Sequence, residues 1–325
     1  MESIYKIDRK NGNCEVYKYF DETHNKYLCK KILTTTSNSK LKAFQQEVDA
    51  LKYINGFPSC LKYYDSKLTS TDKTHTLEII TEFCEKGNLN QYLIKRGENQ
   101  NYFKNKELFF HFSNFISLFS HLQSKNISHR DIKPENIFIV SDTEFKIGDF
   151  GSSTMNLDRN RFTIQGSNFY LSPELREGYE KFLKKIESLY ITHNPFKSDV
   201  YSLGLVFLFM ATLEMITEKF CELKNLDGLL KNKLSMIKNY KIRSVVSIML
   251  TINSEQRPDF IELKSQFLNI IKYPLCSVCL QSCSSNYSYC NSCYSFYHLS
   301  CSSTFYCNEC EESLIVSCNY CKTQK

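Results

Sequence analysis

Residues 128–151 read SHRDIKPENIFIVSDTEFKIGDFG, and this stretch has the most informative pattern of the chain. It brings Asp131, Lys133 and Asn136 close together in the chain, and Asp149 follows after two short apolar runs. Carboxylate and amide oxygens are the ligands that the hard cation Mg²⁺ prefers. A solvated loop explains any one of these polar residues, but not all four at this spacing. We therefore expect a site in which a metal and a proton acceptor lie side by side.

The same stretch resembles the catalytic and metal-binding loops of the eukaryotic protein kinases. The string HRDIKPEN at 129–136 is followed by DFG at 149–151, in the order and at the distance typical of that family. The resemblance covers about residues 4–271. It implies an α+β, two-lobed kinase fold, with a small β-rich N-lobe and a larger helical C-lobe.

The resemblance also implies phosphoryl transfer from ATP. Asp131 would orient and deprotonate the acceptor hydroxyl, and Lys133 would contact the transferring phosphate. Asn136 and Asp149 would bind Mg²⁺. Because Lys133 resembles the serine/threonine branch, the expected acceptor is a Ser or Thr hydroxyl of a protein substrate.

Further family landmarks lie upstream. In KYLCKKIL, Lys30 matches the strand lysine that contacts the α- and β-phosphates, and we expect its neighbour Lys31 to be solvated. Glu47 matches the helix acid that pairs with this lysine, and an exposed helical charge is the alternative. TEFCEKGNL resembles the hinge between the lobes, where backbone groups of Glu82 and Cys84 would meet the adenine.

The stretch RKNGNCEVYK at 9–18 has two properties. Its Asn-Gly pair predicts a hairpin between two strands. If Val16 covers the adenine, the three family glycines are replaced by Arg9, Asn11 and Cys14. Side chains at these positions hinder close backbone approach to phosphates, so we expect slow use of ATP.

Downstream, GSNFYLSPE at 166–174 resembles the end of an activation segment. We expect Glu174 to pair with Arg257 and Asp199 to hold the catalytic loop backbone. Arg130, beside Asp131, implies control by phosphorylation of that segment. Thr163 is the preferred acceptor, and the alternatives are other hydroxyls of the segment: Ser152, Ser153 and Thr154.

Two features of this part of the chain have no clear counterpart in the resemblance. Part of EGYEKFLKKIESLYITHNPF, at 177–196, looks like an insertion beside the substrate groove, and the sequence assigns it no role. Glu135 hints at basic residues near the acceptor, but a surface charge explains it equally well.

Hydrophobic periodicity predicts the secondary structure. Strands are expected at 3–10, 13–20, 26–33 and 77–84. Helices are expected at 40–53, from 89 onward with Asn88 as a cap, and at 107–125, 199–213, 233–250 and 258–270. The aromatic face of 107–125 is best explained by core packing.

The composition is that of a globular protein. The 325 residues are 42% hydrophobic and 23% charged. The longest apolar run, at 203–213, is too short to cross a bilayer and suits a buried helix. The net charge is +6, of which residues 1–272 carry +7 and residues 273–325 carry −1. No arginine-rich stripe accompanies it, so we expect no nucleic-acid partner.

Cysteine is crowded into the C-terminal part, where ten of the fifteen lie between Cys276 and Cys321. The N-terminus has no basic, apolar leader, so we expect a cytoplasmic protein, with the nucleus as an alternative. In such a chain this crowding favours metal over disulfides, which stay the alternative.

The tail predicts a zinc module, because each CxxC pair offers two thiolates to one tetrahedral ion. The expected ligands are Cys276, Cys279, Cys290, Cys293, His298, Cys301, Cys307, Cys310, Cys318 and Cys321. His298 is fifth in this order, which resembles a PHD finger rather than a RING. Cys276 and Cys279 would then share a zinc with His298 and Cys301. Cys290 and Cys293 would join either Cys307 and Cys310 or Cys318 and Cys321.

The predicted domains are a kinase domain at 1–272, divided near residue 84, and a Cys/His-rich zinc module at 273–325. The predicted function is an ATP-dependent serine/threonine kinase that uses Mg²⁺, with Zn²⁺ in a module for partner docking or stabilisation. The alternative is a weakly active or inactive scaffold whose zinc module binds a protein partner.

Overall fold

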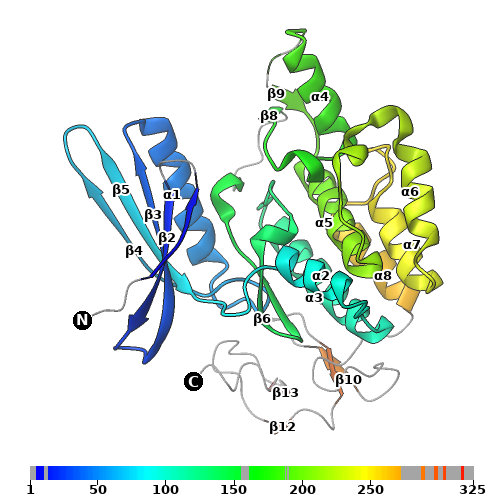
Figure 1. Cartoon of the computed structure of the whole chain (residues 1–325), viewed down its shortest axis with the longest axis horizontal. Coiled ribbons are helices and arrows are strands. Elements are labelled where there is room, and N and C mark those ends of the chain that lie inside the picture. Colours follow the sequence, from blue (N-terminus) through cyan, green and yellow to red (C-terminus); the bar gives the residue numbers. More distant parts are fainter. Residues whose placement is uncertain are drawn as a thin grey trace.

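The computed structural model of the chain describes residues 5–10, 14–154, 161–186, 188 and 190–271, and four short strands beyond them. Two lobes follow one another along the chain (Figure 1). The first is built on a β-sheet and the second on helices. The two-lobed arrangement predicted from the sequence is therefore confirmed.

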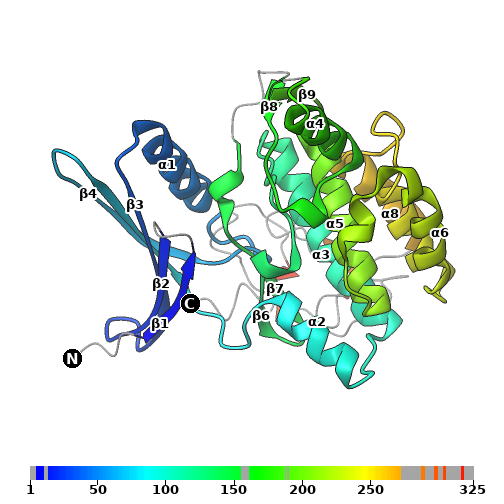
Figure 2. The same cartoon turned by 45° about the horizontal axis from the view of Figure 1, so that its top comes forward.

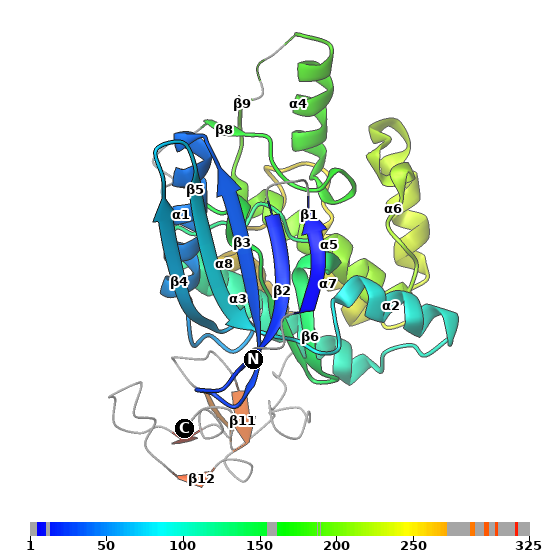
Figure 3. The same cartoon turned by 60° about the vertical axis from the view of Figure 1, so that its left-hand side comes forward.

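The N-lobe is a five-stranded antiparallel sheet in the order β1-β2-β3-β5-β4, with α1 packed across one face (Figure 3). Its elements are β1 (Tyr5–Lys10), β2 (Cys14–Asp21), β3 (Lys26–Thr35), α1 (Asn38–Tyr53), β4 (Tyr63–Ser70) and β5 (His75–Glu82). The sequence did not predict β4. It is an edge strand whose residues are mostly exposed, so it carries little apolar pattern.

The C-lobe is helical. Its long helices are α2 (Leu89–Glu98), α3 (Asn105–Ser124), α4 (Pro173–Leu183), α5 (Pro195–Thr212), α6 (Leu226–Ser235), α7 (Tyr240–Met249) and α8 (Phe260–Ile271). Short 3-10 turns occur at η1 (Pro134–Asn136), η2 (Phe150–Ser152), η3 (Asn168–Tyr170), η4 (Glu218–Cys221) and η5 (Leu223–Asn225). Asn88 caps α2 by accepting from the Gln91 amide, as predicted.

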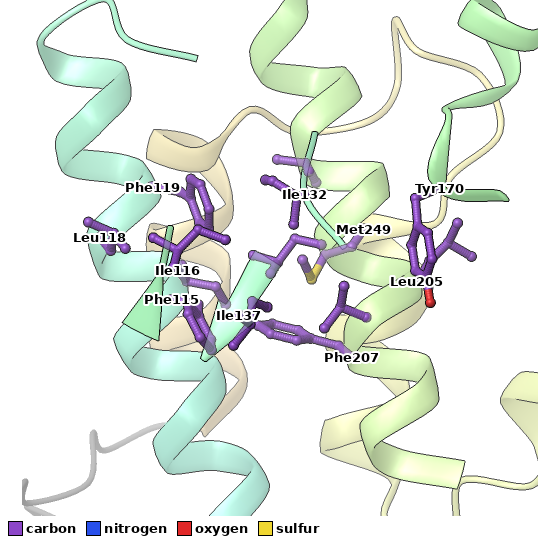
Figure 4. Packing of buried hydrophobic residues seen from close by; sticks show 14 of the residues in the cluster. Phe115, Ile116, Leu118, Phe119, Ile132, Ile137, Tyr170, Leu205, Phe207 and Met249 are labelled. Carbon is purple, nitrogen blue, oxygen red and sulfur yellow. The ribbon is translucent and has the colours of Figure 1, made fainter. Parts of the chain in front are cut away.

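The core of this lobe joins α3, α5 and α7 to the catalytic loop. Figure 4 shows Phe115 and Phe119 of α3, Phe207 of α5 and Met249 of α7 around Ile137. Residues 203–210 of the apolar run are buried in α5, and the aromatic face of α3 is buried too, so a buried helix and core packing are both confirmed. The catalytic loop therefore packs against a closely packed helical core, which restricts its movement.

One predicted helix is wrong. The stretch 233–250 is not continuous, because α6 ends at Ser235 and α7 begins at Tyr240. The Asn239 side chain accepts from the amides of Lys241 and Ile242, and so caps a new helix. An asparagine that bonds to its own downstream backbone favours a cap over a helix interior.

Short pairs of antiparallel strands occur in the C-lobe and beyond it. β6 (Ile137–Ser141) pairs with β7 (Glu144–Ile147), and β8 (Arg161–Thr163) pairs with β9 (Tyr190–Thr192). Beyond residue 271, β10 (Tyr287–Tyr289) pairs with β11 (Phe296–His298), and β12 (Ser303–Thr304) pairs with β13 (Val316–Ser317). Among the described residues, no helix is long and apolar enough for a membrane span.

Candidate active site

Lys31, not Lys30, is the strand lysine of the site. Its Nζ donates to Glu47 Oε1 at 2.7 Å and to Asp149 Oδ1 at 2.9 Å. Lys30 lies 3.7 Å from Glu78 and over the ring of Tyr19 instead. The assignment of the phosphate-contacting role to Lys30 is therefore corrected, whereas Glu47 does pair with a lysine of β3.

Strand register explains the correction. Successive side chains of a strand point to opposite faces, so a shift of one residue changes the face. Lys31 stands opposite Val16 on β2 and opposite Ile79 on β5. Val16 and Lys31 thus share the face that meets Glu47. Lys30 is on the other face of the sheet.

The DFG stretch at 149–151 is shaped to receive this lysine. Asp149 has a φ of 61°, in the left-handed region where a non-glycine residue is strained. A Cβ on Gly151 would lie 3.2 Å from Glu47 Oε2. The absence of a side chain on Gly151 therefore lets the buried Glu47 carboxylate lie close to the DFG backbone. The Asp149 carboxylate accepts from Lys31, which also donates to Glu47.

Asp131 is held by the catalytic loop and by Ser167. Its Oδ2 accepts from Lys133 Nζ at 2.8 Å, and Asn136 Nδ2 donates to its backbone oxygen at 2.8 Å. Its Oδ1 accepts from the amide and the hydroxyl of Ser167, at 2.8 and 2.9 Å. The three predicted residues of this loop therefore lie together. Ser167, in the stretch GSNFYLSPE at 166–174, joins them, although the sequence pattern gave it no role.

The charges of the site are set by burial and by partners. Burial raises the pKa of Asp131, but the hydrogen bond and charge of Lys133 and the Ser167 hydroxyl bring it below its ordinary value. Burial lowers the pKa of Lys31, but the charges of Glu47 and Asp149 raise it overall. Asp131 is thus ionised and Lys31 protonated at neutral pH.

The backbone of the catalytic loop is held by Asp199 of α5. Asp199 accepts from the amides of His129 and Arg130, at 2.7 and 2.8 Å, as predicted. Arg130 has a φ of 66°, in the left-handed region where a non-glycine backbone is strained. The two bonds to Asp199 stabilise this conformation, which directly precedes Asp131. His129 is fully buried against Phe150 and lies 3.2 Å from the Gly148 oxygen. It links the catalytic loop to the DFG stretch.

The donor set fits Mg²⁺. The Oδ1 atom of Asn136 is buried and accepts no hydrogen bond from the described residues, which is costly unless a cation or water meets it. Asp149 supplies a carboxylate from the neighbouring loop. An amide oxygen and a carboxylate oxygen are the ligands that a magnesium ion with bound phosphates takes from a protein.

The hinge is held by a side chain that the sequence did not single out. Lys146 of β7 is buried, and its Nζ donates to both carboxylate oxygens of Glu82, at 2.8 and 2.9 Å. The Glu82 amide donates to the Lys62 oxygen at 2.9 Å, so that amide is not available to adenine. Cys84 is buried, and burial raises the pKa of its thiol, which therefore stays protonated.

Arg130 and Arg257 both contact the activation segment, residues 149–174. Arg130 donates to the backbone oxygen of Thr163 and, at 3.1 Å, to its hydroxyl. Glu174 accepts from Arg257 at 2.9 and 3.1 Å, which confirms the predicted bridge. Burial raises the pKa of Glu174, but Arg257 brings it below its ordinary value.

Some predictions lie outside the described residues. These are Asn11 and Gly12 of the first hairpin, and the side chains of Arg9 and the zinc ligands at 276–321. The backbone pairing of Arg9 with Glu15 confirms the hairpin itself. Among the side chains that the structure describes, no group of three or more His, Cys, Asp or Glu could hold a metal ion.

Comparison with known proteins agrees with this geometry. A family model described as the protein kinase domain matches residues 11–279. The interferon-induced, double-stranded RNA-activated protein kinase of Rattus norvegicus is 32% identical over 200 residues, which cover 60% of this chain and 36% of the relative. Its counterpart in Mus musculus is 28% identical over 255 residues, with shares of 73% and 45%.

A third relative covers more of both chains. The serine/threonine-protein kinase nekl-2 of Caenorhabditis elegans is 28% identical over 262 residues, or 75% of this chain and 67% of the relative. The matches to the rat and mouse proteins span less than half of those longer chains. The family model alone covers most of this chain, and the chain therefore belongs to the protein kinase family.

Proposed function

We propose that this protein transfers the γ-phosphate of ATP to a Ser or Thr hydroxyl of a protein substrate. The observation that carries the proposal is that Lys31 donates hydrogen bonds to both Glu47 and Asp149. These contacts would place the lysine for binding of the nucleotide phosphates. Phosphoryl transfer depends on such positioning and on neutralised charge rather than on covalent chemistry.

The chain's own residues divide the work. Asp131 orients the acceptor hydroxyl and takes its proton, because it is ionised and held from both sides. Lys133 stands beside it and stabilises negative charge on the transferring group. Asn136 and Asp149 would hold Mg²⁺, which supplies neutralisation of the phosphate oxygens when bound.

The nucleotide would lie under β2 and along the hinge. Lys31 would contact its α- and β-phosphates, and Val16 would cover the adenine from the same face of the sheet. The backbone of Cys84 and the carbonyl of Glu82 are the proposed partners of the adenine edge. The replaced glycines of the first hairpin support a slow reaction, because side chains there keep the backbone from the phosphates.

The test is phosphate transfer from Mg²⁺-ATP to casein by the purified full chain. We expect measurable transfer by the wild type and a loss of at least about 100-fold in Asp131→Asn, which keeps the shape but removes the proton acceptor. Equal signals from both proteins would reject the catalytic proposal. The scaffold alternative would then stand.

We further propose that the C-terminal tail is a zinc module that docks a protein partner or stabilises the chain. The support is its four CxxC pairs and His298, and the attachment to a kinase rather than to a secreted domain. Zinc measured by native mass spectrometry should be two or three ions per chain. A chain free of zinc, with or without disulfides, would reject the module.

The proposed setting is the cytoplasm, with the nucleus as an alternative. Imaging of the tagged full chain in its own cells tests it, and accumulation in a secretory compartment would overturn it.

A further inference from the structure

The stretch 177–196, to which the sequence assigned no role, is built onto the activation segment. Strand β9 from this stretch pairs antiparallel with β8 of the segment. Phe162 stands opposite Ile191, and Thr163 stands opposite Tyr190. Figures 1 and 2 show β8, β9 and α4 together at one end of the C-lobe. Backbone pairing thus ties two segments that lie far apart in the chain.

Side chains reinforce the pairing. Ile164 and Leu171 of the activation segment form a small cluster with Leu175 of α4, and Ile191 packs against it. This cluster is separate from the main core of the lobe. Ile191 is therefore an apolar anchor for the activation segment.

Gly178 of α4 makes room for this anchor. A Cβ at that position would lie 2.8 Å from Ile191 Cγ2 and 3.2 Å from Ile164 Cδ1. The β-branched Ile191 has little rotamer freedom to move away. The absence of a side chain on this turn of α4 therefore lets both isoleucines reach the helix.

Phe162 and Thr163 complete the contact on the catalytic side. The Phe162 ring lies between His193, at 5.4 Å between ring centroids, and the Arg130 guanidinium, at 5.8 Å. Arg130 also bonds to Thr163. Arg130, Thr163 and His193 line a space of about 10 Å³ beside this contact, which holds about one water molecule.

The anchored segment leads directly to the catalytic carboxylate. Four residues after Thr163, Ser167 donates its amide and hydroxyl to Asp131 and meets Lys133. All of these contacts are made by the chain's own groups. None of them needs a phosphate on Thr163.

We propose that β9, through Ile191, is a positioning element that holds the activation segment, and with it Ser167 against Asp131, without phosphorylation of Thr163. This inference rests on the proposed kinase function and adds to it. It departs from the expectation that a phosphate on Thr163 orders the segment. Ile191 is a positioning residue, since its described contacts are with the activation segment and α4.

The first test compares Ile191→Ala with Ile186→Ala. Both lose the same atoms from the same stretch, but Ile186 is 67% exposed. All proteins are treated with phosphatase and checked by mass spectrometry for an unmodified Thr163. We expect kcat/KM for casein to fall about tenfold in Ile191→Ala, because the reaction rate falls steeply when catalytic groups are displaced. We expect the KM for ATP of Ile191→Ala to stay within about twofold of wild type. Both the kcat/KM for casein and the KM for ATP of Ile186→Ala should stay within the same range.

A second variant separates positioning from simple loss of stability. Gly178→Ala favours helix α4 by itself, because alanine is the better helix former. It crowds Ile191, however, so its kcat/KM should fall like that of Ile191→Ala. Wild-type activity in both variants would overturn the proposal. So would a dephosphorylated wild type that is inactive until Thr163 is phosphorylated.

Hydrogen exchange gives a readout that needs no catalysis. Amides of residues 161–171 should exchange at least about tenfold faster in Ile191→Ala than in Ile186→Ala, because lost pairing opens the segment locally. Unchanged exchange would overturn the proposal. If neither the phosphorylated nor the dephosphorylated wild type exceeds Asp131→Asn in transfer, the kinase function fails, and the exchange result still decides whether β9 holds the segment.

Discussion

At the scale of the residue, the site depends on which face of a strand a side chain occupies. Two adjacent lysines of β3 have the same chemistry, yet only Lys31 reaches Glu47 and Asp149. Lys30 makes a longer, partly exposed contact with Glu78. The difference comes from the period of two in a strand, and composition or charge cannot reveal it.

The two lysines should respond differently to the same substitution. Lys31→Met removes the cation between two carboxylates and should lower kcat by at least about 100-fold, as expected for a lost stabilising charge in a catalytic site. Lys30→Met should change kcat by less than about twofold, because a partly exposed ion pair contributes little. Steady-state transfer to casein measures both. The reverse ranking would show that the register-based assignment is wrong.

At the scale of the element, the hinge is fixed to the C-lobe by Lys146 of β7. This lysine is 3% exposed and contacts Glu82 and Glu144. Burial lowers its pKa, but the charges of Glu82 and Glu144 raise it overall, so it stays charged. The carboxylate of Glu82 also accepts from the Lys62 amide. The strand before the hinge and the strand before DFG are thereby held together.

Breaking this link should affect nucleotide binding more than turnover. Lys146→Met leaves the Glu82 carboxylate without its buried cation and should raise KM for ATP about fivefold, at a cost of about 3 kcal/mol in unfolding free energy. The matched control is Lys86→Met, because Lys86 pairs with Asp142 at the surface. The control should keep KM and stability near wild type. An unchanged KM for ATP in Lys146→Met would show that the contact of Lys146 with Glu82 does not support nucleotide binding.

At the scale of the whole molecule, buried polar contacts join segments that lie far apart in the chain. Arg257 is fully buried and bonds to Glu174 and to the backbone oxygens of Lys197, Thr251 and Ile252. One guanidinium thus links the end of the activation segment to α5 and to the loop before α8. A pair of this kind is costly to break from one side, because the remaining charge stays buried.

The pair should make stability depend on pH in a defined direction. The folded pKa of Glu174 lies below its ordinary value of 4.5, so the stabilisation is full above that pH and is lost as the pH falls through the folded pKa. Glu174→Gln should lower the unfolding free energy by about 3 kcal/mol at neutral pH. Its difference from wild type should shrink in acid.

Urea unfolding at several pH values tests this dependence, with Asp227→Asn as the control. Asp227 pairs with Lys231 on an exposed helix face, so its loss should cost less than about 0.5 kcal/mol. A Glu174→Gln difference that stays constant down to pH 3 would show that the carboxylate charge is not the cause.

Local sequence patterns were enough to predict the kinase family, the two lobes and the catalytic loop. Asp131, Lys133 and Asn136 stand within one short loop, so local spacing already brings them together, and the helices around them follow from apolar periodicity. The choice between Lys30 and Lys31 needed the folded chain, because strand register is set by pairing with β2 and β5. The contacts of Lys146 with Glu82 and of Ile191 with the activation segment needed it too, because they link residues with no shared local pattern.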